Sequence, residues 1–185
     1  MRLFLAIELP ADVRNHLMEV RRRLEAQLPK IAYTRGENLH LTLKFLGEVE
    51  AKKIAAMTES LSLIRSRPIE LSASGMDCFP SRGPIKIVTA AMEGTLGPLR
   101  ALVESIEQRC KFLGFEKEQR VYRPHVTIGR ARPVLSAKFR ASCDETTADL
   151  WPGPTFAPTE FVLMESQLGA EGSKYSVVAR FAVAG

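Results

Sequence analysis

Two short segments of the chain carry the same four-residue pattern, and this repetition constrains the fold more than any other feature. The segments His40–Leu43 and His125–Ile128 read HLTL and HVTI, so each gives a histidine, an aliphatic residue, a threonine and a second aliphatic residue in order. The two copies lie nearly half a chain length apart. A repeat at this spacing predicts an internal duplication, with two half-sites related by a pseudo-twofold axis.

The order of residue types within each segment predicts a β-strand. Side chains on a strand point alternately to its two faces, so His40 and Thr42 share one face while the aliphatic residues share the other. The same alternation places His125 and Thr127 on one face of the second strand. If the aliphatic faces are buried in a core, the two strands present two imidazoles and two hydroxyls to one small site.

The composition of the 185 residues is that of a folded globular protein. Hydrophobic residues make up 45% and charged residues 25%, which argues against intrinsic disorder. No apolar run approaches the roughly 18 residues that a membrane-spanning helix needs, so we expect no membrane association. The formal net charge of +5 permits a partner that carries phosphate.

The cysteines and histidines indicate neither a disulfide framework nor a metal site. Cys78, Cys110 and Cys143 are far apart and form no C-x-x-C pair, so we expect three core or inert thiols in a reducing cytoplasm. The spacing of histidine, cysteine and acidic residues offers no convincing set of metal ligands. The third histidine, His16, falls in the middle of an expected helix, where we predict a surface position.

Helical and strand patterns alternate along the chain and predict an α+β fold, with no linker between the halves. We expect helices at about 10–28, 51–64 and 96–113, and strands at about 2–8, 31–34, 39–46, 68–76, 84–90, 123–130, 156–168 and 175–183. The segment 131–155 is rich in proline, glycine and small polar residues, which fits either an ordered loop or a short helix.

Two imidazoles near neutral pH can divide acid–base work, because one can accept a proton while the other donates one. Threonine hydroxyls can donate hydrogen bonds to the non-bridging oxygens of a phosphoryl group held between the imidazoles. A strained cyclic phosphodiester needs only an activated water, a protonated leaving oxygen and stabilisation of charge. The duplicated pattern therefore predicts hydrolysis of such a diester without a metal ion or a cofactor.

Three runs of the sequence, MRLFLAIELP, ENLHLTLKFLGEV and YRPHVTIGR, resemble the RNA 2',3'-cyclic phosphodiesterases of the two-histidine (2H) phosphoesterase superfamily, also called LigT-like or 2'-5' RNA ligase-like proteins. The similarity continues to FVLMESQL and KYSVVARFAV and so covers essentially the whole chain. It implies one domain over residues 1–185, with two intertwined, pseudo-symmetric lobes. In each lobe, antiparallel sheet is packed by helices, and the lobes enclose a central groove.

The resemblance also implies an activity and roles for the duplicated residues. The reaction is hydrolysis of an RNA or nucleotide 2',3'-cyclic phosphate to a 2'-phosphomonoester. Independently of the resemblance, we expect the protein to act as a monomer in the cytoplasm. His40 would donate a proton to the departing 3' oxygen, and His125 would accept a proton from water. Thr42 and Thr127 would bind the phosphate.

Two further residues that the resemblance implies are Phe45 and Arg130, which would contact the substrate base. Strand alternation argues otherwise, because it places Phe45 on the core side and Arg130 opposite His125 unless Gly129 permits a bulge.

The same alternation places two other basic residues, Lys44 and Arg123, on the histidine face. Either side chain could bind phosphate there, or remain an ordinary solvated charge.

Two other functions stay open at this point. One is the reverse chemistry, which would join tRNA halves through a 2'-5' linkage, since forward and reverse reactions share their transition states. The other is a non-catalytic RNA-binding module, which the basic balance permits but which lacks the paired aromatic residues of sheet-face RNA readers.

Overall fold

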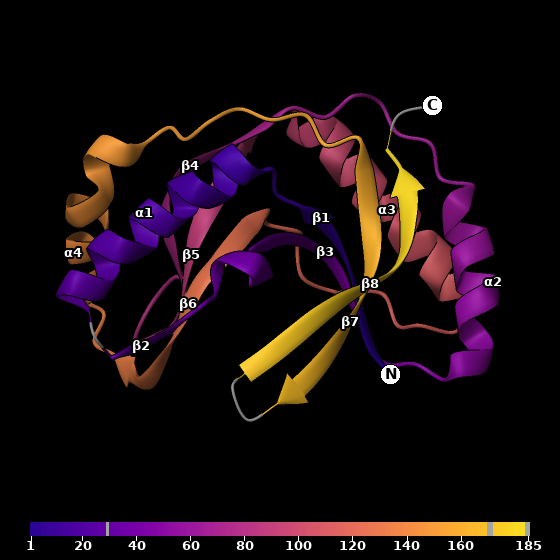
Figure 1. Ribbon diagram of the computed structural model, residues 1–185, viewed down its shortest axis with the longest axis horizontal. Coiled ribbons are helices and arrows are strands. Elements are labelled where there is room, and N and C mark those ends of the chain that lie inside the picture. Colours follow the sequence, from indigo (N-terminus) through magenta and orange to yellow (C-terminus); the bar gives the residue numbers. More distant parts are fainter. Residues whose placement is uncertain (29, 170–171, 184–185) are drawn as a thin grey trace.

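Eight strands form one antiparallel sheet in the computed structural model, which describes residues 1–28, 30–169 and 172–183 (Figure 1). The strands are β1 (Arg2–Glu8), β2 (Ile31–Tyr33), β3 (His40–Glu48), β4 (Leu71–Phe79), β5 (Ile85–Gly94), β6 (His125–Leu135), β7 (Glu160–Gly169) and β8 (Gly172–Ala182). The α-helices are α1 (Ala11–Gln27), α2 (Ala51–Ser62), α3 (Leu96–Phe112) and α4 (Phe139–Thr147), with short 3-10 turns at Gly36–Asn38 and Ala148–Leu150. The predicted α+β class is confirmed.

The order of strands in the sheet reveals the duplication. It runs β4-β5-β6-β3-β1-β7-β8, and β2 pairs with β6 beside this path. Apart from β2, which is inserted between α1 and β3, the series β1-α1-β3-α2-β4 is repeated as β5-α3-β6-α4-β7. The last strand of each series pairs with the first strand of the other, since β4 pairs with β5 and β7 pairs with β1. The two repeats are therefore intertwined, and β3 and β6 meet where their half-sheets join.

The helices show the same exchange between repeats. Helix α1 packs against α4 beside β2 and β4, and helix α2 packs against α3 beside β3 and β8 (Figure 1). Each pair thus combines one helix from each repeat.

One hydrophobic core lies between the helices and the sheet. Helix α1 contributes residues at three- and four-residue spacing, Val13, Leu17, Val20 and Leu24, all fully buried. The aliphatic residues of the two repeated segments join the same core. Since neighbouring strand residues point to opposite faces, the histidines lie on the face away from the helices, which we call the histidine face.

Three expectations about individual segments can now be settled. Residues 131–155 contain the end of β6 and then a short helix, α4, so the helical alternative is correct. The three cysteines are free and buried, as expected. His16 is half-buried rather than on the open surface, because its ring packs edge-on against Trp151 at 5.5 Å.

No helix in the described part of the chain is both long and apolar enough to cross a membrane.

Candidate active site

Each repeated histidine is the first residue of its strand, and each ring is held in the same way. Nδ1 of His40 lies 2.8 Å from the carbonyl oxygen of Asn38, and Nδ1 of His125 lies 2.7 Å from the carbonyl oxygen of Arg123. A carbonyl oxygen can only accept a hydrogen bond, so Nδ1 carries the proton in both rings. This leaves Nε2 of each imidazole to accept or donate a proton elsewhere.

The pairing of β3 with β6 brings the four repeated polar residues together. Leu41 is the Cα partner of Val126 in this antiparallel pair. The residues on either side of that pair lie opposite one another, which places His40 across from Thr127 and Thr42 across from His125. All four side chains are half-buried on the histidine face, so the predicted cluster of two imidazoles and two hydroxyls is present.

Aromatic rings pack against both histidines. The ring of His40 contacts Phe4 of β1 at 4.9 Å and Tyr175 of β8 at 5.3 Å between centroids, and the ring of His125 contacts Phe79 of β4 at 5.0 Å. Burial among these groups lowers the pKa of His40 below its usual value of 6.5, and the charge of His125 lowers it further. The neutral form of His40 is therefore favoured in the free protein.

A β-bulge explains why strand alternation gave the wrong side for Phe45. Where β3 pairs with β1, Leu5 is opposite Lys44 and Ala6 is opposite Thr42, so Leu43 is an extra residue. Leu43 and Lys44 both point into the core as a result, and Phe45 turns out to the histidine face with 68% of its surface exposed.

The matching bulge occurs in β6 and turns Arg130 outward. Val88 is opposite Gly129 and Thr89 is opposite Thr127, so Ile128 is the extra residue. Arg130 is consequently exposed on the same face as His125. The glycine is required, because a Cβ at this position would lie 2.4 Å from Cγ2 of Ile31.

The two basic residues assigned to the histidine face, Lys44 and Arg123, lie in different surroundings. Lys44 is buried and its ammonium group lies 2.7 Å from Oε2 of Glu107 in α3, so it neither meets phosphate nor remains a solvated charge, and both alternatives are wrong for this residue. Arg123 does lie beside His125. Its guanidinium group sits 5.6 Å from the centre of the Phe79 ring and 3.7 Å from Oδ2 of Asp77.

Sequence reasoning missed the aromatic residues that cover the imidazoles. Phe4 is hidden inside an apolar strand, and only its alternation with the buried Leu3 and Leu5 could have assigned it to the histidine face. Tyr175 is far from His40 in the sequence, and no local pattern connects the two. Phe79 is likewise far from His125 in the sequence, and no local pattern connects these two residues.

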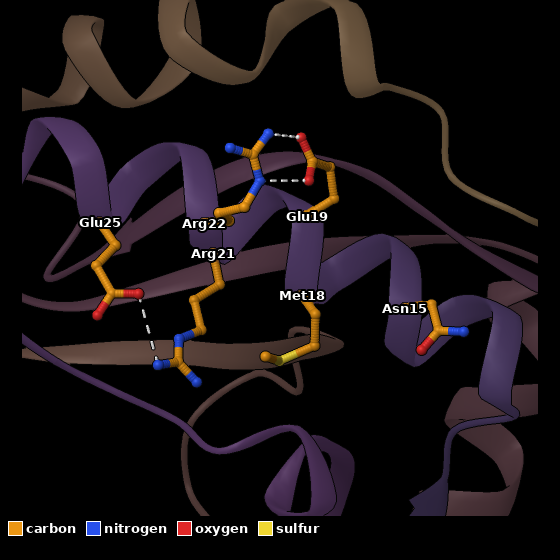
Figure 2. Close-up of a pocket in the computed structure, with 6 residues that line it drawn as sticks. All are labelled: Asn15, Met18, Glu19, Arg21, Arg22 and Glu25. Carbon is orange, nitrogen blue, oxygen red and sulfur yellow. Dashed lines mark hydrogen bonds and ion pairs between the residues drawn. The ribbon is translucent and has the colours of Figure 1, made fainter.

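Among the described residues, neither a metal-binding cluster nor the hollow along α1 forms part of this site. No group of three or more His, Cys, Asp or Glu side chains in the described residues could hold a metal ion. A hollow of about 370 Å³ lies along the outer side of α1 (Figure 2). Its lining side chains pair with one another, Arg22 with Glu19 and Arg21 with Glu25, and none of them belongs to the histidine cluster.

Comparison with known proteins gives a consistent result. The family described as LigT like Phosphoesterase matches residues 7–89 and 91–175. An RNA 2',3'-cyclic phosphodiesterase from Methanocaldococcus jannaschii is 31% identical over 179 residues, which are 96% of this chain and 98% of the relative. One of the same name from Thermotoga maritima is 31% identical over 182 residues, covering 96% and 93%.

Among solved structures, the crystal structure of Escherichia coli LigT complexed with 3'-AMP superimposes with a TM-score of 0.79 at 26% identity. The match covers 98% of this chain and 97% of that chain.

Proposed function

The chain belongs to the LigT-like phosphoesterase family, and from this premise we propose that it hydrolyses 2',3'-cyclic phosphate ends of RNA, or cyclic nucleotides, to 2'-phosphomonoesters. The observation that carries the proposal is the paired geometry of His40 and His125. In both rings Nδ1 donates a hydrogen bond to a backbone carbonyl, and both rings belong to one cluster with Thr42 and Thr127.

His125 serves as the general base in this reaction. Its Nε2 accepts a proton from water while the water oxygen forms a new bond to phosphorus. Because Nδ1 already donates to the carbonyl of Arg123, the neutral ring has its lone pair on Nε2, as a base requires.

His40 serves as the general acid. As the bond between phosphorus and the 3' oxygen breaks, Nε2 of the protonated ring donates its proton to that oxygen, which leaves a 3'-hydroxyl and a 2'-phosphomonoester. The lowered pKa of His40 disfavours the protonated ring in the free enzyme. The negative charge of a bound phosphodiester acts in the opposite direction and raises the pKa of a neighbouring imidazole.

The two threonines hold the phosphoryl group between the rings. Thr42 and Thr127 lie across from His125 and His40, so a hydroxyl flanks each imidazole. Each hydroxyl can donate to a non-bridging oxygen, where negative charge grows as the five-coordinate phosphorus forms. These residues meet every requirement of the reaction, and the proposal therefore assigns no metal ion and no cofactor.

The residues around the cluster suit the rest of a nucleotide. The exposed ring of Phe45 and the exposed guanidinium of Arg130 occupy corresponding positions after the two bulges, on either side of the cluster. Both offer a surface on which a base can stack. Arg123, beside His125, adds positive charge for phosphate. The proposal also includes action as a monomer in the cytoplasm.

The test is a turnover experiment with a short RNA that ends in a 2',3'-cyclic phosphate, in excess chelator. We expect hydrolysis, with the 2'-phosphomonoester as the product. Binding without turnover would overturn the proposal in favour of an RNA-binding module, and so would turnover that requires an added metal ion. A 3'-phosphomonoester would show that the other oxygen departs. Adding an RNA with a free 5'-hydroxyl measures how much product carries a 2'-5' linkage.

A further inference from the structure

The junction between the two half-sites is weakly defined by the backbone. In the described residues, β3 and β6 share one pair of Cα partners, Leu41 with Val126. By contrast, the pairing of β3 with β1 extends from His40 to Glu48. Catalysis by an acid on β3 and a base on β6 requires a fixed distance between them, and a single ladder pair constrains that distance at one point.

Side chains supply two additional connections across this junction. Both join β3 to the segment 113–124, which leaves α3 and leads directly into His125, and the second also joins β3 to α3 itself. In the first, the hydroxyl of Tyr122 donates a hydrogen bond of 3.0 Å to the carbonyl oxygen of Thr42. Tyr122 is three residues before His125 and Thr42 is two residues after His40, so this one bond links the first repeated segment to the residues just before the second.

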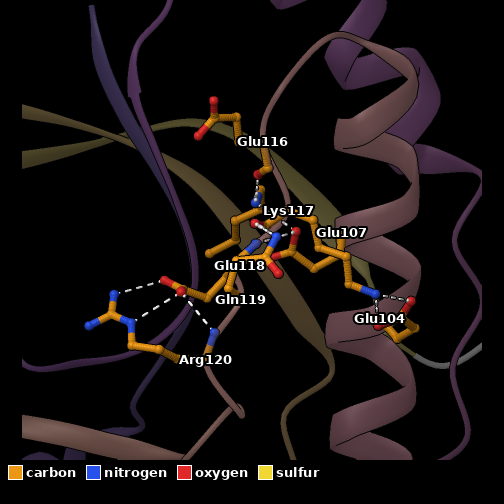
Figure 3. Close-up of polar contacts among 8 residues, drawn as sticks. Glu104, Glu107, Glu116, Lys117, Glu118, Gln119 and Arg120 are labelled. Atoms are coloured by element: carbon orange, nitrogen blue, oxygen red, sulfur yellow. Dashed lines mark hydrogen bonds and ion pairs between the residues drawn. The ribbon is translucent and has the colours of Figure 1, made fainter.

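The second connection is a buried ion pair. The ammonium group of Lys44 lies 2.7 Å from Oε2 of Glu107 and donates to the carbonyl oxygen of Glu116 at 2.9 Å. The side chains of Lys44 and Glu107 are 4% and 6% exposed. Oε2 of Glu107 also accepts from the backbone N–H of Glu118 at 3.4 Å (Figure 3). Lys44 therefore fixes both α3 and the segment before His125 to β3.

Two other ion pairs of the segment 113–124 are exposed rather than buried. Lys117 pairs with Glu104, and Arg120 pairs with Glu118, both on the surface (Figure 3). Neither pair reaches β3, and exposed pairs contribute little to stability. A buried ion pair costs desolvation that its attraction barely offsets, so its value lies more in fixing geometry than in stability.

We propose that Tyr122 and the Lys44–Glu107 pair are positioning residues that set the separation of the His40 and His125 half-sites. This inference rests on the proposed function for its effect on turnover. It goes beyond that function because none of the three side chains touches the reacting groups. They act through the backbone of Thr42 and through the segment that carries Arg123 and His125.

The experiment compares Tyr122→Phe with Tyr33→Phe. Both variants remove one hydroxyl that donates to a backbone carbonyl at 3.0 Å, but the bond of Tyr33 goes to Leu28, away from the junction. We expect Tyr122→Phe to lower kcat on the cyclic end at least tenfold with KM changed less than twofold, because small misplacements of reacting groups are costly. Tyr33→Phe is expected to change neither.

The second readout is the titration of His40 by NMR, which requires no turnover. The charge of His125 contributes to the lowered pKa of His40, so separation of the half-sites in Tyr122→Phe should move the midpoint toward 6.5. Glu8, the Cα partner of His40 on β1, pairs with Arg180 of β8 at 2.7 Å, and the variant touches neither of these charges.

The outcomes separate the two proposals. If the wild type does not turn over, the proposed function fails, and the His40 titration alone decides the positioning role. The role is overturned if Tyr122→Phe leaves the midpoint of His40 unchanged, if its loss of activity falls on KM, or if Tyr33→Phe shows the same loss. The double variant Lys44→Met with Glu107→Leu, which leaves no buried charge, should lower kcat as Tyr122→Phe does.

Discussion

The two half-sites have the same strand but different surroundings. In both, the histidine bonds to the carbonyl two residues earlier, and the threonine follows two residues later. In both, a bulge turns the residue five positions after the histidine, Phe45 or Arg130, outward. What differs is the packing. His40 is enclosed by Phe4 and Tyr175, while His125 has Phe79 and the nearby Arg123. A duplicated strand thus provides two equivalent groups, and the unequal neighbours allow those groups to do unequal work.

The comparison is tested most severely by removing one hydroxyl from each half. Thr42→Val and Thr127→Val keep the side-chain shape and delete the hydroxyl that the proposed function assigns to the phosphoryl group. We expect each to lower kcat by about 10²–10³-fold, as for loss of one oxyanion donor. Thr147→Val, which removes a buried hydroxyl bonded to the carbonyl of Cys143, serves as the control and should leave kcat unchanged.

If one of the two threonine variants retains nearly full activity, then only the other half-site binds the phosphoryl group. The equivalence of the two strands would then be limited to their backbone. Steady-state kinetics on a cyclic nucleotide is sufficient for this measurement.

Substitutions of the fourth residue after each histidine, Lys44 and Gly129, should give the next largest effects. These effects are on stability rather than on activity. Lys44→Met leaves Glu107 buried without its partner and should reduce the free energy of unfolding by about 3 kcal/mol. Gly129→Ala places a Cβ 2.4 Å from Ile31 and should cost about 2 kcal/mol. Urea denaturation measures both. Lys117→Met, which loses an exposed pair with Glu104, should cost under about 1 kcal/mol. Equal losses for all three would contradict this reading of the core.

The smallest expected effect is a shift in pH dependence that distinguishes the two rings. The proposed mechanism requires one neutral and one protonated imidazole, so we expect kcat/KM to rise with pH as the doubly protonated pair loses its first proton. The lowered pKa of His40 places this acidic limb below pH 6.5. Tyr175→Ala exposes His40, raises its pKa and should move the limb upward by less than about one pH unit.

Phe79→Ala provides the matched control, since Phe79 packs on His125 instead. An acidic limb that stays in place in Tyr175→Ala, or that moves to lower pH, would show that burial by Tyr175 does not set the titration of His40.

The sequence predicted the parts of this site that depend on neighbouring residues. His40 and Thr42 share a face because two residues along a strand always do, and the copy in β6 follows the same rule. Alternation failed at Phe45, since a bulge depends on how β3 pairs with β1, strands that are far apart in the chain. Gly129 was the one local sign of the second bulge.

Long-range partners account for the rest of what could not be predicted. Strand alternation assigned Lys44 to the histidine face, whereas in the structure its side chain is buried and bonds to Glu107, a buried carboxylate from α3. The pairing of β4 and β7 with strands of the other repeat could likewise not be predicted from the spacing of the strands along the chain. It depends on which edge of the sheet each of these strands joins.

The central claim is that His40 and His125 act as one acid–base pair, and a double-mutant cycle tests it most directly. We expect His40→Ala and His125→Ala each to lower kcat by about 10³-fold, with His16→Ala as the control. The double variant should be no more than a few-fold slower than the slower single variant, since either loss disables the pair. Losses that multiply in the double variant, or nearly full activity in either single variant, would contradict the account.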